Sequence, residues 1–143
     1  SLNAVNLNPV QITVKQFSGL VLISNDNDFN NIISKKFGSF KQLFHIKLKD
    51  NISNEDLNSI KNSLDSNNIE IISIDYVSGG LKNELGLEVR TNRTSSILNL
   101  FEKYNHQIIS IDRVMLAGLS KKDLPRGKWR LLKKQEVVNL NSF

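Results

Sequence analysis

The strongest constraint on the fold is the alternation of residue types in "KQLFHIKLK", residues 41–49. Successive side chains of an extended chain point to opposite faces of a sheet. Phe44, Ile46 and Leu48 therefore share one face, and His45 and Lys47 lie on the other. This pattern predicts a strand with one buried face and one face in water, with His45 as a surface residue.

Comparable patterns predict the remaining elements of the chain. Further strands are expected at residues 10–14, 19–24, 69–77, 85–90 and 107–116. Helices are expected at residues 26–37, 53–64, 94–104 and 133–140, with Asp26 and Ser53 as N-caps of the first two. Strands outnumber helices and no repeat is present, so the predicted class is α+β, a mostly antiparallel sheet with helices packed on it.

Length and composition limit the function classes. The 143 residues fit one domain, and a chain of this size buries roughly 70% of its unfolded surface on folding. The absence of cysteine excludes thiolate catalysis and cysteine metal sites. No apolar run approaches the roughly 20 residues of a membrane span, so no membrane partner is expected. Residues 1–8 are predicted to form an extended N-terminal arm without the features of a signal peptide.

Positive charge is concentrated near the C-terminal end. The net charge is +5, and residues 113–134 contain eight basic residues against one acid, Asp123. A basic segment attached to a nearly neutral body is typical of a polyanion-binding protein, and a merely solvated segment is the alternative. Trp129 lies inside this segment and could be a core anchor or a base-stacking residue. Lys128 and Arg130 flank it and are predicted to face away from it on a strand.

The usual catalytic and ligand-binding motifs are missing. His45 and His106 are far apart in sequence and have no neighbouring acid cluster, so no metal site is predicted, and His106 is expected to end a helix. "NDND", at 25–28, lacks the glycine and glutamate of a calcium loop and fits a helix N-cap better. Nucleotide-binding glycine motifs are also absent, and neither a cofactor nor a small-molecule substrate is expected.

Residues 9–33, "PVQITVKQFSGLVLISNDNDFNNII", are similar to a Pro-Val-Gly-Arg-Leu-Asp signature with its following Thr-Gly-Leu-Leu-Leu-Leu-Thr-Asn-Asp-Gly, which is that of the RsuA/RluB-type ribosomal RNA pseudouridine synthases. "FEKYNHQIISIDRVMLAGLSKKDLPRGKWRLLKKQEV" is similar to the family's ending, which closes on Leu-Pro-x-Gly-Lys-Trp-Arg-x-Leu. The resemblance extends from about Pro9 to Val138 and implies one pseudouridine-synthase-like domain over residues 1–143. The resemblance covers the family's catalytic domain, and a counterpart of the family's N-terminal S4-like RNA-binding domain is not expected.

The departures from the family pattern fall on its catalytic residues. The catalytic Asp corresponds to Val14, the preceding Arg to Ile12, and the active-site Tyr to Phe44. In the family's arginine-rich helix only Arg93 is retained. The other arginine positions hold Ser95, Leu98 and Asn99. A valine cannot act as a nucleophile or a general base, so the resemblance implies an inactive relative of these enzymes. Val14 and Phe44, both apolar, are expected to fill the cleft.

The basic segment, in contrast, follows the family pattern closely. The resemblance therefore implies a catalytically inactive protein that binds ribosomal RNA of the large subunit, as a ribosome constituent beside neighbouring ribosomal proteins. We expect a cytoplasmic, ribosome-associated location, with an organellar ribosome as the alternative. The residues expected to contact RNA are Arg90, Arg93, Arg113, Lys121, Lys122, Arg126, Lys128, Arg130, Lys133 and Lys134.

Three other functions are compatible with the sequence. A transient ribosome assembly factor would leave mature subunits, whereas a constituent would remain on them. An active synthase would need a displaced nucleophile, for which Asp26 and Asp112 are the nearest acids. A general binder of acidic ligands or of membrane surfaces is the third, although no amphipathic helix favours it.

Overall fold

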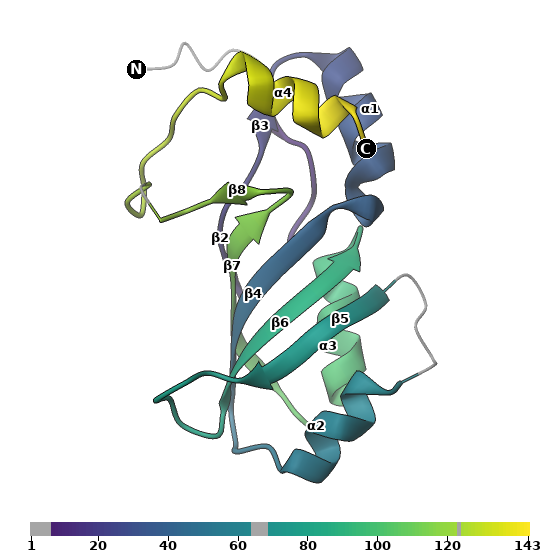
Figure 1. The fold of residues 1–143 in the computed structure, drawn as a ribbon, viewed down its shortest axis with the longest axis vertical. Helices are drawn as coiled ribbons and strands as arrows, with labels where there is room; N and C mark the ends of the chain where they lie inside the picture. The colour runs from purple at the N-terminus through teal and green to yellow at the C-terminus, as the bar shows by residue number, and fades with distance from the viewer. Residues whose placement is uncertain (1–6, 64–68, 123) are drawn as a thin grey trace.

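The computed structural model describes residues 7–63, 69–122 and 124–143, and most of its strands belong to one sheet (Figure 1). The strands in order across this sheet are β2 (Phe17–Gly19), β7 (Ile108–Leu116), β4 (Lys41–Leu48), β6 (Glu84–Thr91) and β5 (Ile69–Tyr76), with β8 (Leu119–Ser120) pairing with β7. The β2–β7 pair is parallel and all other pairs are antiparallel. The predicted α+β class with a mostly antiparallel sheet is therefore confirmed.

The centre of the fold is a β-α-β-β-α-β unit. Helix α2 (Asn54–Lys61) connects β4 to β5, and helix α3 (Thr94–Glu102) connects β6 to β7. Both helices lie on the same side of the sheet (Figure 1). In this arrangement the first and last strands of the unit are neighbours in the middle of the sheet, and each crossing helix covers the face behind them.

The main core lies between the sheet and these two helices. Phe44, Ile46 and Leu48 on β4 are fully buried, and they pack in one cluster with Leu57 on α2 and Phe101 on α3. His45 and Lys47, which alternate with the buried residues, are exposed on the opposite face. The half-buried strand predicted from the alternating pattern is confirmed at this position.

The predicted helix starts are also confirmed. The Ser53 hydroxyl accepts a hydrogen bond from the Asp56 N–H at 3.1 Å, which caps α2. Helix α1 (Asn27–Lys36) begins after Asp26, whose Oδ1 accepts from the N–H groups of Asp28 and Phe29. The side chain of Asp26 is thus used as a helix cap, as the sequence "NDND" predicted.

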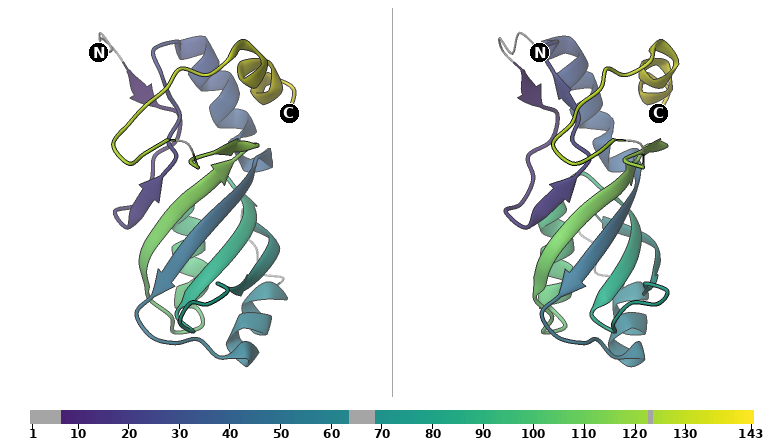
Figure 2. Two further views of the ribbon diagram at one scale, coloured as in Figure 1. Left: turned by 60° about the vertical axis from the view of Figure 1, so that its left-hand side comes forward. Right: turned by 90° about the vertical axis from the view of Figure 1, so that its left-hand side faces the viewer.

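A second, smaller core lies at the other end of the sheet, beneath α1 and the C-terminal helix α4 (Lys134–Asn141) (Figure 2). Its buried members are Val10, Ile33, Phe37, Phe40, Leu116 and Leu140. The single-turn helix η1 (Phe37–Ser39) and the short pair β1 (Asn8–Pro9) and β3 (Ile23–Ser24) complete this layer. Leu140 anchors α4 here, so the basic segment is fixed to the body at both of its ends.

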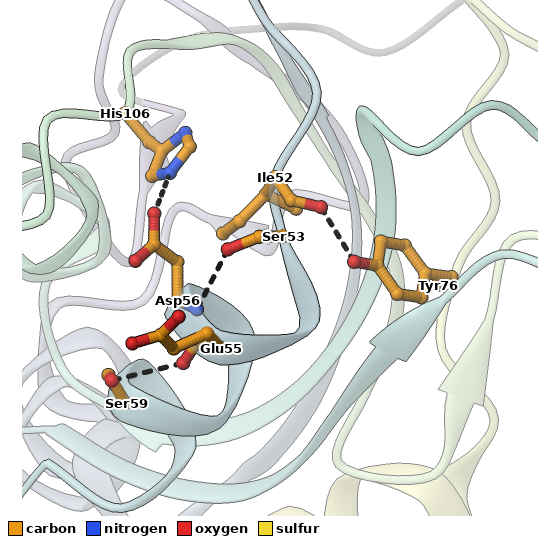
Figure 3. A network of polar contacts seen from close by, with 7 residues as sticks. All are labelled: Ile52, Ser53, Glu55, Asp56, Ser59, Tyr76 and His106. Atoms are coloured by element: carbon orange, nitrogen blue, oxygen red, sulfur yellow. Dashed lines mark hydrogen bonds and ion pairs between the residues drawn. The ribbon is translucent and has the colours of Figure 1, made fainter.

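Helix α2 is held against the body by side-chain hydrogen bonds at its N-terminal end (Figure 3). His106 Nε2 lies 2.9 Å from Asp56 Oδ2, and the Tyr76 hydroxyl donates to the Ile52 carbonyl at 2.6 Å. His106 was predicted to end a helix, but α3 ends at Glu102, and His106 lies in the loop before β7, where its side chain is only 10% exposed and joins this loop to α2.

We expect Tyr76→Phe to lower the free energy of unfolding by about 1 kcal/mol, because a short hydrogen bond to a backbone carbonyl is lost without a change in packing. Tyr104→Phe is the matched control, since its hydroxyl reaches the Ser59 carbonyl only at 3.3 Å. Its expected loss is below about 0.5 kcal/mol. Urea denaturation of both variants tests this, and equal losses would contradict it.

Two predicted strands near the N-terminal end differ from the structure. Residues 10–14 form no strand, and residues 19–24 contain strand only at Gly19 and at Ile23–Ser24. Most of the predicted N-terminal arm, residues 1–8, lies outside the described residues. None of the helices in the described part of the chain has the length and apolar character to cross a lipid bilayer.

Candidate nucleic-acid interface

A cleft of about 410 Å³ opens between residues 10–14 and the N-terminal end of α3. Its lining residues are Val10, Gln11, Ile12, Thr13, Val14, Ser34, Phe37, Asn92, Arg93, Thr94 and Ser95. Residues about 80 positions apart in sequence thus face one another across it. Gln11, Ser34 and Asn92 carry no recognisable motif, and sequence inspection had no signal by which to find them.

Side chain to backbone hydrogen bonds hold the two walls of the cleft at a fixed spacing. The Gln11 side-chain amide donates to the Asn92 carbonyl at 2.7 Å. The Val14 N–H donates to the Thr94 hydroxyl at 3.1 Å. The Val14 N–H therefore bonds to the start of α3 in place of the sheet pairing that the sequence predicted, while the Val10 N–H bonds to the Leu22 carbonyl at 2.9 Å.

Arg93 is the N-cap residue of α3, and its side chain is exposed at the cleft. Its N–H donates to the Thr91 hydroxyl at 3.2 Å, which fixes the backbone while leaving the guanidinium in solvent. The helix N-terminus adds partial positive charge at the same place. This corner of the cleft is therefore suited to an anion.

The expectation that Val14 and Phe44 fill the cleft is wrong. Val14 is half-buried, and it contributes to the wall while packing partly against the main core. Phe44 is completely buried in that core and does not line the cleft. Residues 10–14 form no strand, and Ile12 among them is 90% exposed.

The cleft has a mixed lining of apolar and polar residues and carries a positive charge. Among the described residues that line it there is no carboxylate and no imidazole, and Arg93 is the one charged group. The other polar groups are hydroxyls and amides, and Thr94 already accepts a hydrogen bond from Val14. No set of three or more potential metal ligands occurs among the residues that the structure describes. This lining can bind an anionic ligand but offers no group to take or give a proton.

Arg113 does not belong to an RNA-facing surface, which corrects the expectation from the sequence. Its side chain is 1% exposed and is the largest fully buried one. The Nε and Nη2 groups donate to the Leu20 carbonyl, and Nη1 donates to the side-chain oxygens of Gln11 and Gln42. Its guanidinium connects residues 11–20 to the sheet and to one wall of the cleft, so its role is structural.

Three further cations predicted to bind RNA already have acidic partners. Arg90 donates to Glu70 at 2.9 Å across β5 and β6. Lys121 pairs with Asp112. Arg130 makes two parallel hydrogen bonds to Glu136, both at 2.8 Å. Their charge is largely neutralised locally, so these side chains are less available to a phosphate than isolated cations.

The remaining predicted cations are exposed and make no ion pair with any residue in the described ranges. They are Arg93, Lys122, Arg126, Lys128, Lys133 and Lys134. All except Arg93 belong to the chain between β8 and α4 or to the first residue of α4, at the upper left in Figure 1. We refer to Lys122, Arg126, Lys128, Lys133 and Lys134 as the basic loop.

The basic loop differs from the sequence prediction in its backbone. Lys128, Trp129 and Arg130 lie in no strand, so they are not arranged on alternate strand faces. Trp129 is 53% exposed, which excludes the core-anchor alternative. The loop presents cations and one aromatic ring to solvent together.

Comparisons with known proteins address the fold. No protein-family model and no curated protein sequence matches the chain. Among solved structures, a crystal structure of a pseudouridylate synthase is similar to 94% of this chain, with a TM-score of 0.72 and 14% sequence identity. The chain spans 60% of the length of that structure. The chain therefore has a pseudouridine-synthase-like fold.

Proposed function

We propose that this protein is a catalytically inactive pseudouridine-synthase-like protein that binds ribosomal RNA as a constituent of the ribosome. The observation that carries the proposal is the charge of the two candidate surfaces. The described lining of the cleft has a cation, Arg93, and no acid, while the basic loop adds five exposed cations. A polyanion fits both surfaces, and RNA is the polyanion that the fold and the sequence resemblance favour.

Catalytic inactivity follows from what the cleft lacks. The sequence resemblance places the family's catalytic Asp at Val14, and Val14 does line the cleft beside Arg93. The two acids that could replace it are used elsewhere and do not line the cleft: Asp26 caps α1, and Asp112 pairs with Lys121. A hydroxyl without a neighbouring base is a weak nucleophile, so Ser34 and Thr94 do not replace a carboxylate.

Neighbouring proteins are the second kind of partner that we propose. Several large apolar side chains are exposed, among them Ile12, Leu81 and Ile23 at 90%, 70% and 57%. A protein that docks permanently can bury such residues against its neighbours, in addition to its contacts with RNA. A ribosome constituent fits this surface better than an enzyme that visits RNA briefly.

Sedimentation with ribosomes tests the proposed function. We expect the protein to remain with mature subunits, on which both RNA and protein contacts are available, and to dissociate as the salt concentration of the wash rises. Recovery on precursor particles alone would indicate an assembly factor. Absence from all ribosomal particles would overturn the proposal.

Replacing Val14 by aspartate tests whether the cleft is open to water and whether the protein is catalytically inactive. We expect Val14→Asp to change the free energy of unfolding by less than about 1 kcal/mol, because the new carboxylate can reach water in the open cleft. Chemical mapping of ribosomal RNA fragments should detect no pseudouridine with the wild type or the variant. Val14→Leu is the size control. Pseudouridine formation by the wild type would contradict inactivity, and a stability loss above about 2 kcal/mol would mean that the site is dry.

A further inference from the structure

The exposed indole ring of Trp129 has no role in the RNA binding described above. It is the one tryptophan of the chain, and 53% of it is exposed. Among the described residues, none stacks on the ring, places a cation over it, or accepts a hydrogen bond from its Nε1. Tryptophan usually buries most of its large apolar surface, so an unpartnered ring on the surface indicates a ligand or a partner.

The backbone on both sides of Trp129 is fixed. On one side, the Lys128 N–H donates to the Pro125 carbonyl at 3.0 Å, and Gly127 has φ 78°, which closes a tight turn. The third residue of such a turn needs a positive φ, a conformation that glycine adopts without strain. The turn therefore sets the direction in which the chain leaves Lys128 and enters Trp129.

On the other side, Glu136 holds the loop at the start of α4. Its carboxylate accepts two hydrogen bonds from Arg130 and one from the Lys133 N–H, each at 2.8 Å. These hydrogen bonds lower the pKa of Glu136 to about 2, so the carboxylate is ionised at neutral pH. Trp129 lies between a hydrogen-bonded turn and the hydrogen bonds of Glu136, which reduce the backbone entropy that is lost when a ligand binds.

The charges around Trp129 select an anionic ligand. Arg126 and Lys128 precede the ring, Lys133 and Lys134 follow it, and all four are exposed without an ion pair to a described residue. Glu136 is already neutralised by Arg130. An aromatic ring for a base, with cations for the flanking phosphates, is the arrangement found in proteins that bind unpaired nucleotides.

We propose that Trp129 stacks on an unpaired base, so that the basic loop binds RNA at a bulge or a loop in preference to a continuous duplex. This inference rests on the proposed RNA binding and specifies the kind of RNA structure that is recognised. Bases inside an A-form helix are stacked on one another, and their faces are closed to a side chain. Phosphate contacts alone would not distinguish a duplex from a bulged duplex.

The test uses the fluorescence of the chain's one tryptophan, which reports directly on this site. The probes are a short RNA duplex with one bulged nucleotide and the same duplex fully paired. We expect the bulged RNA to quench the fluorescence and the paired RNA to leave it nearly unchanged. Trp129→Ala lacks this fluorophore, so its binding is measured by the fluorescence anisotropy of labelled RNA. It should bind the bulged RNA about 5- to 150-fold more weakly, the range of a single stacked base, and the paired duplex equally well.

Matched variants separate stacking from general apolar contact. Trp129→Phe should retain part of the preference for the bulged RNA, because a phenyl ring still stacks. Leu131→Ala removes a neighbouring apolar side chain that is 75% exposed, and binding should be unchanged. An equal loss of affinity in Leu131→Ala and Trp129→Ala would overturn stacking and indicate a protein-docking patch.

The inference and the proposed function fail in distinguishable ways. RNA binding measured by fluorescence anisotropy, with no quenching and no loss in Trp129→Ala, would overturn stacking and leave RNA binding intact. No binding of either RNA and no association with ribosomes would overturn both.

Discussion

Replacing Arg113 by Met should lower the free energy of unfolding by about 3 kcal/mol or more. Three acceptors would lose their donors, namely the Leu20 carbonyl, now bonded at 2.9 and 2.7 Å, and the oxygens of Gln11 and Gln42, at 2.8 and 3.1 Å. A buried acceptor without a donor costs about 1–3 kcal/mol, because its hydration is lost without replacement. Methionine fills similar space, so a cavity contributes little to this expected loss.

The charge of Arg113 is stabilised mainly by aromatic rings and neutral acceptors. The centroids of Phe17, Phe37 and Phe44 lie 4.8, 5.3 and 6.0 Å from its Cζ, and no carboxylate among the described residues bonds to it. Burial lowers the pKa of Arg113 to about 10, so the guanidinium is charged at neutral pH. Arg113→Lys should therefore also be destabilising, since a single ammonium cannot reproduce the planar set of donors.

Urea denaturation of Arg113→Met, Arg113→Lys and Arg93→Met measures these effects. Arg93 is the control because it is exposed at the cleft, and its replacement should change stability by less than about 0.5 kcal/mol. If Arg113→Met lost no more than Arg93→Met, the guanidinium would not hold residues 11–20 to the sheet, and the structural role given to it would be wrong.

The burial of Arg113 could not be predicted from the sequence. It lies on β7, where register shifts relative to β4 occur at two places, near Ile109 and near Val114. Each shift adds one residue to a strand with a two-residue repeat, so each reverses which face the following side chains occupy. Ile109 is exposed while Arg113 is buried, although the two residues are an even number of positions apart. From the concentration of basic residues Arg113 was predicted to be an exposed cation. Its burial depends on the register of β7 against β4, which the sequence does not show.

The regular elements were predictable because their patterns are local. The alternation in β4 and the caps Ser53 and Asp26 depend on residues within a few positions of one another. The segment at residues 10–14 alternates equally well but forms no strand: the Val14 N–H bonds to Thr94, and side chains of the segment line the cleft. A strand-like pattern shows only that a segment can fit a pleated sheet. Tertiary contacts decide whether the segment pairs with a neighbouring strand.

The candidate site was predictable in its location more than in its detail. The resemblance brought Val14 and Arg93 into one site, and both line the cleft. Phe44 is fully buried in the main core, and Asn99 does not line the cleft. The sequence did not show which basic residues are free to contact a phosphate, because the acidic partners of Arg90 and Lys121 lie 20 and 9 positions away along the chain.

Removing three charges of the basic loop should have the largest effect on binding. Lys122, Arg126 and Lys128 are exposed and make no ion pair within the described part of the chain, so each can contact a phosphate. Each contact contributes about 0.9 to the slope of log K against log salt, so replacing all three by Gln should reduce the slope by about 2.7. If affinity near 1 M salt is unchanged, binding at about 0.15 M salt should be weaker by roughly a hundredfold.

A second triple variant controls for general charge loss. Lys47, Lys49 and Lys61 are also exposed, and they lie at the end of β4 and in α2, away from the basic loop (Figure 1). Their replacement by Gln removes the same net charge, so long-range attraction decreases equally while the phosphate contacts remain. Affinity should then fall only slightly and the slope should be nearly unchanged.

The two triple variants together distinguish direct contacts from overall charge. Salt titrations of RNA binding and ribosome co-sedimentation supply the slopes, and thermal melts should show both variants folded, because exposed cations contribute little to stability. Arg130 and Lys121 are left in place, since their pairs with Glu136 and Asp112 support the loop itself. Equal slopes for the two variants would mean that the basic loop is only solvated and that RNA, if it binds, contacts another face.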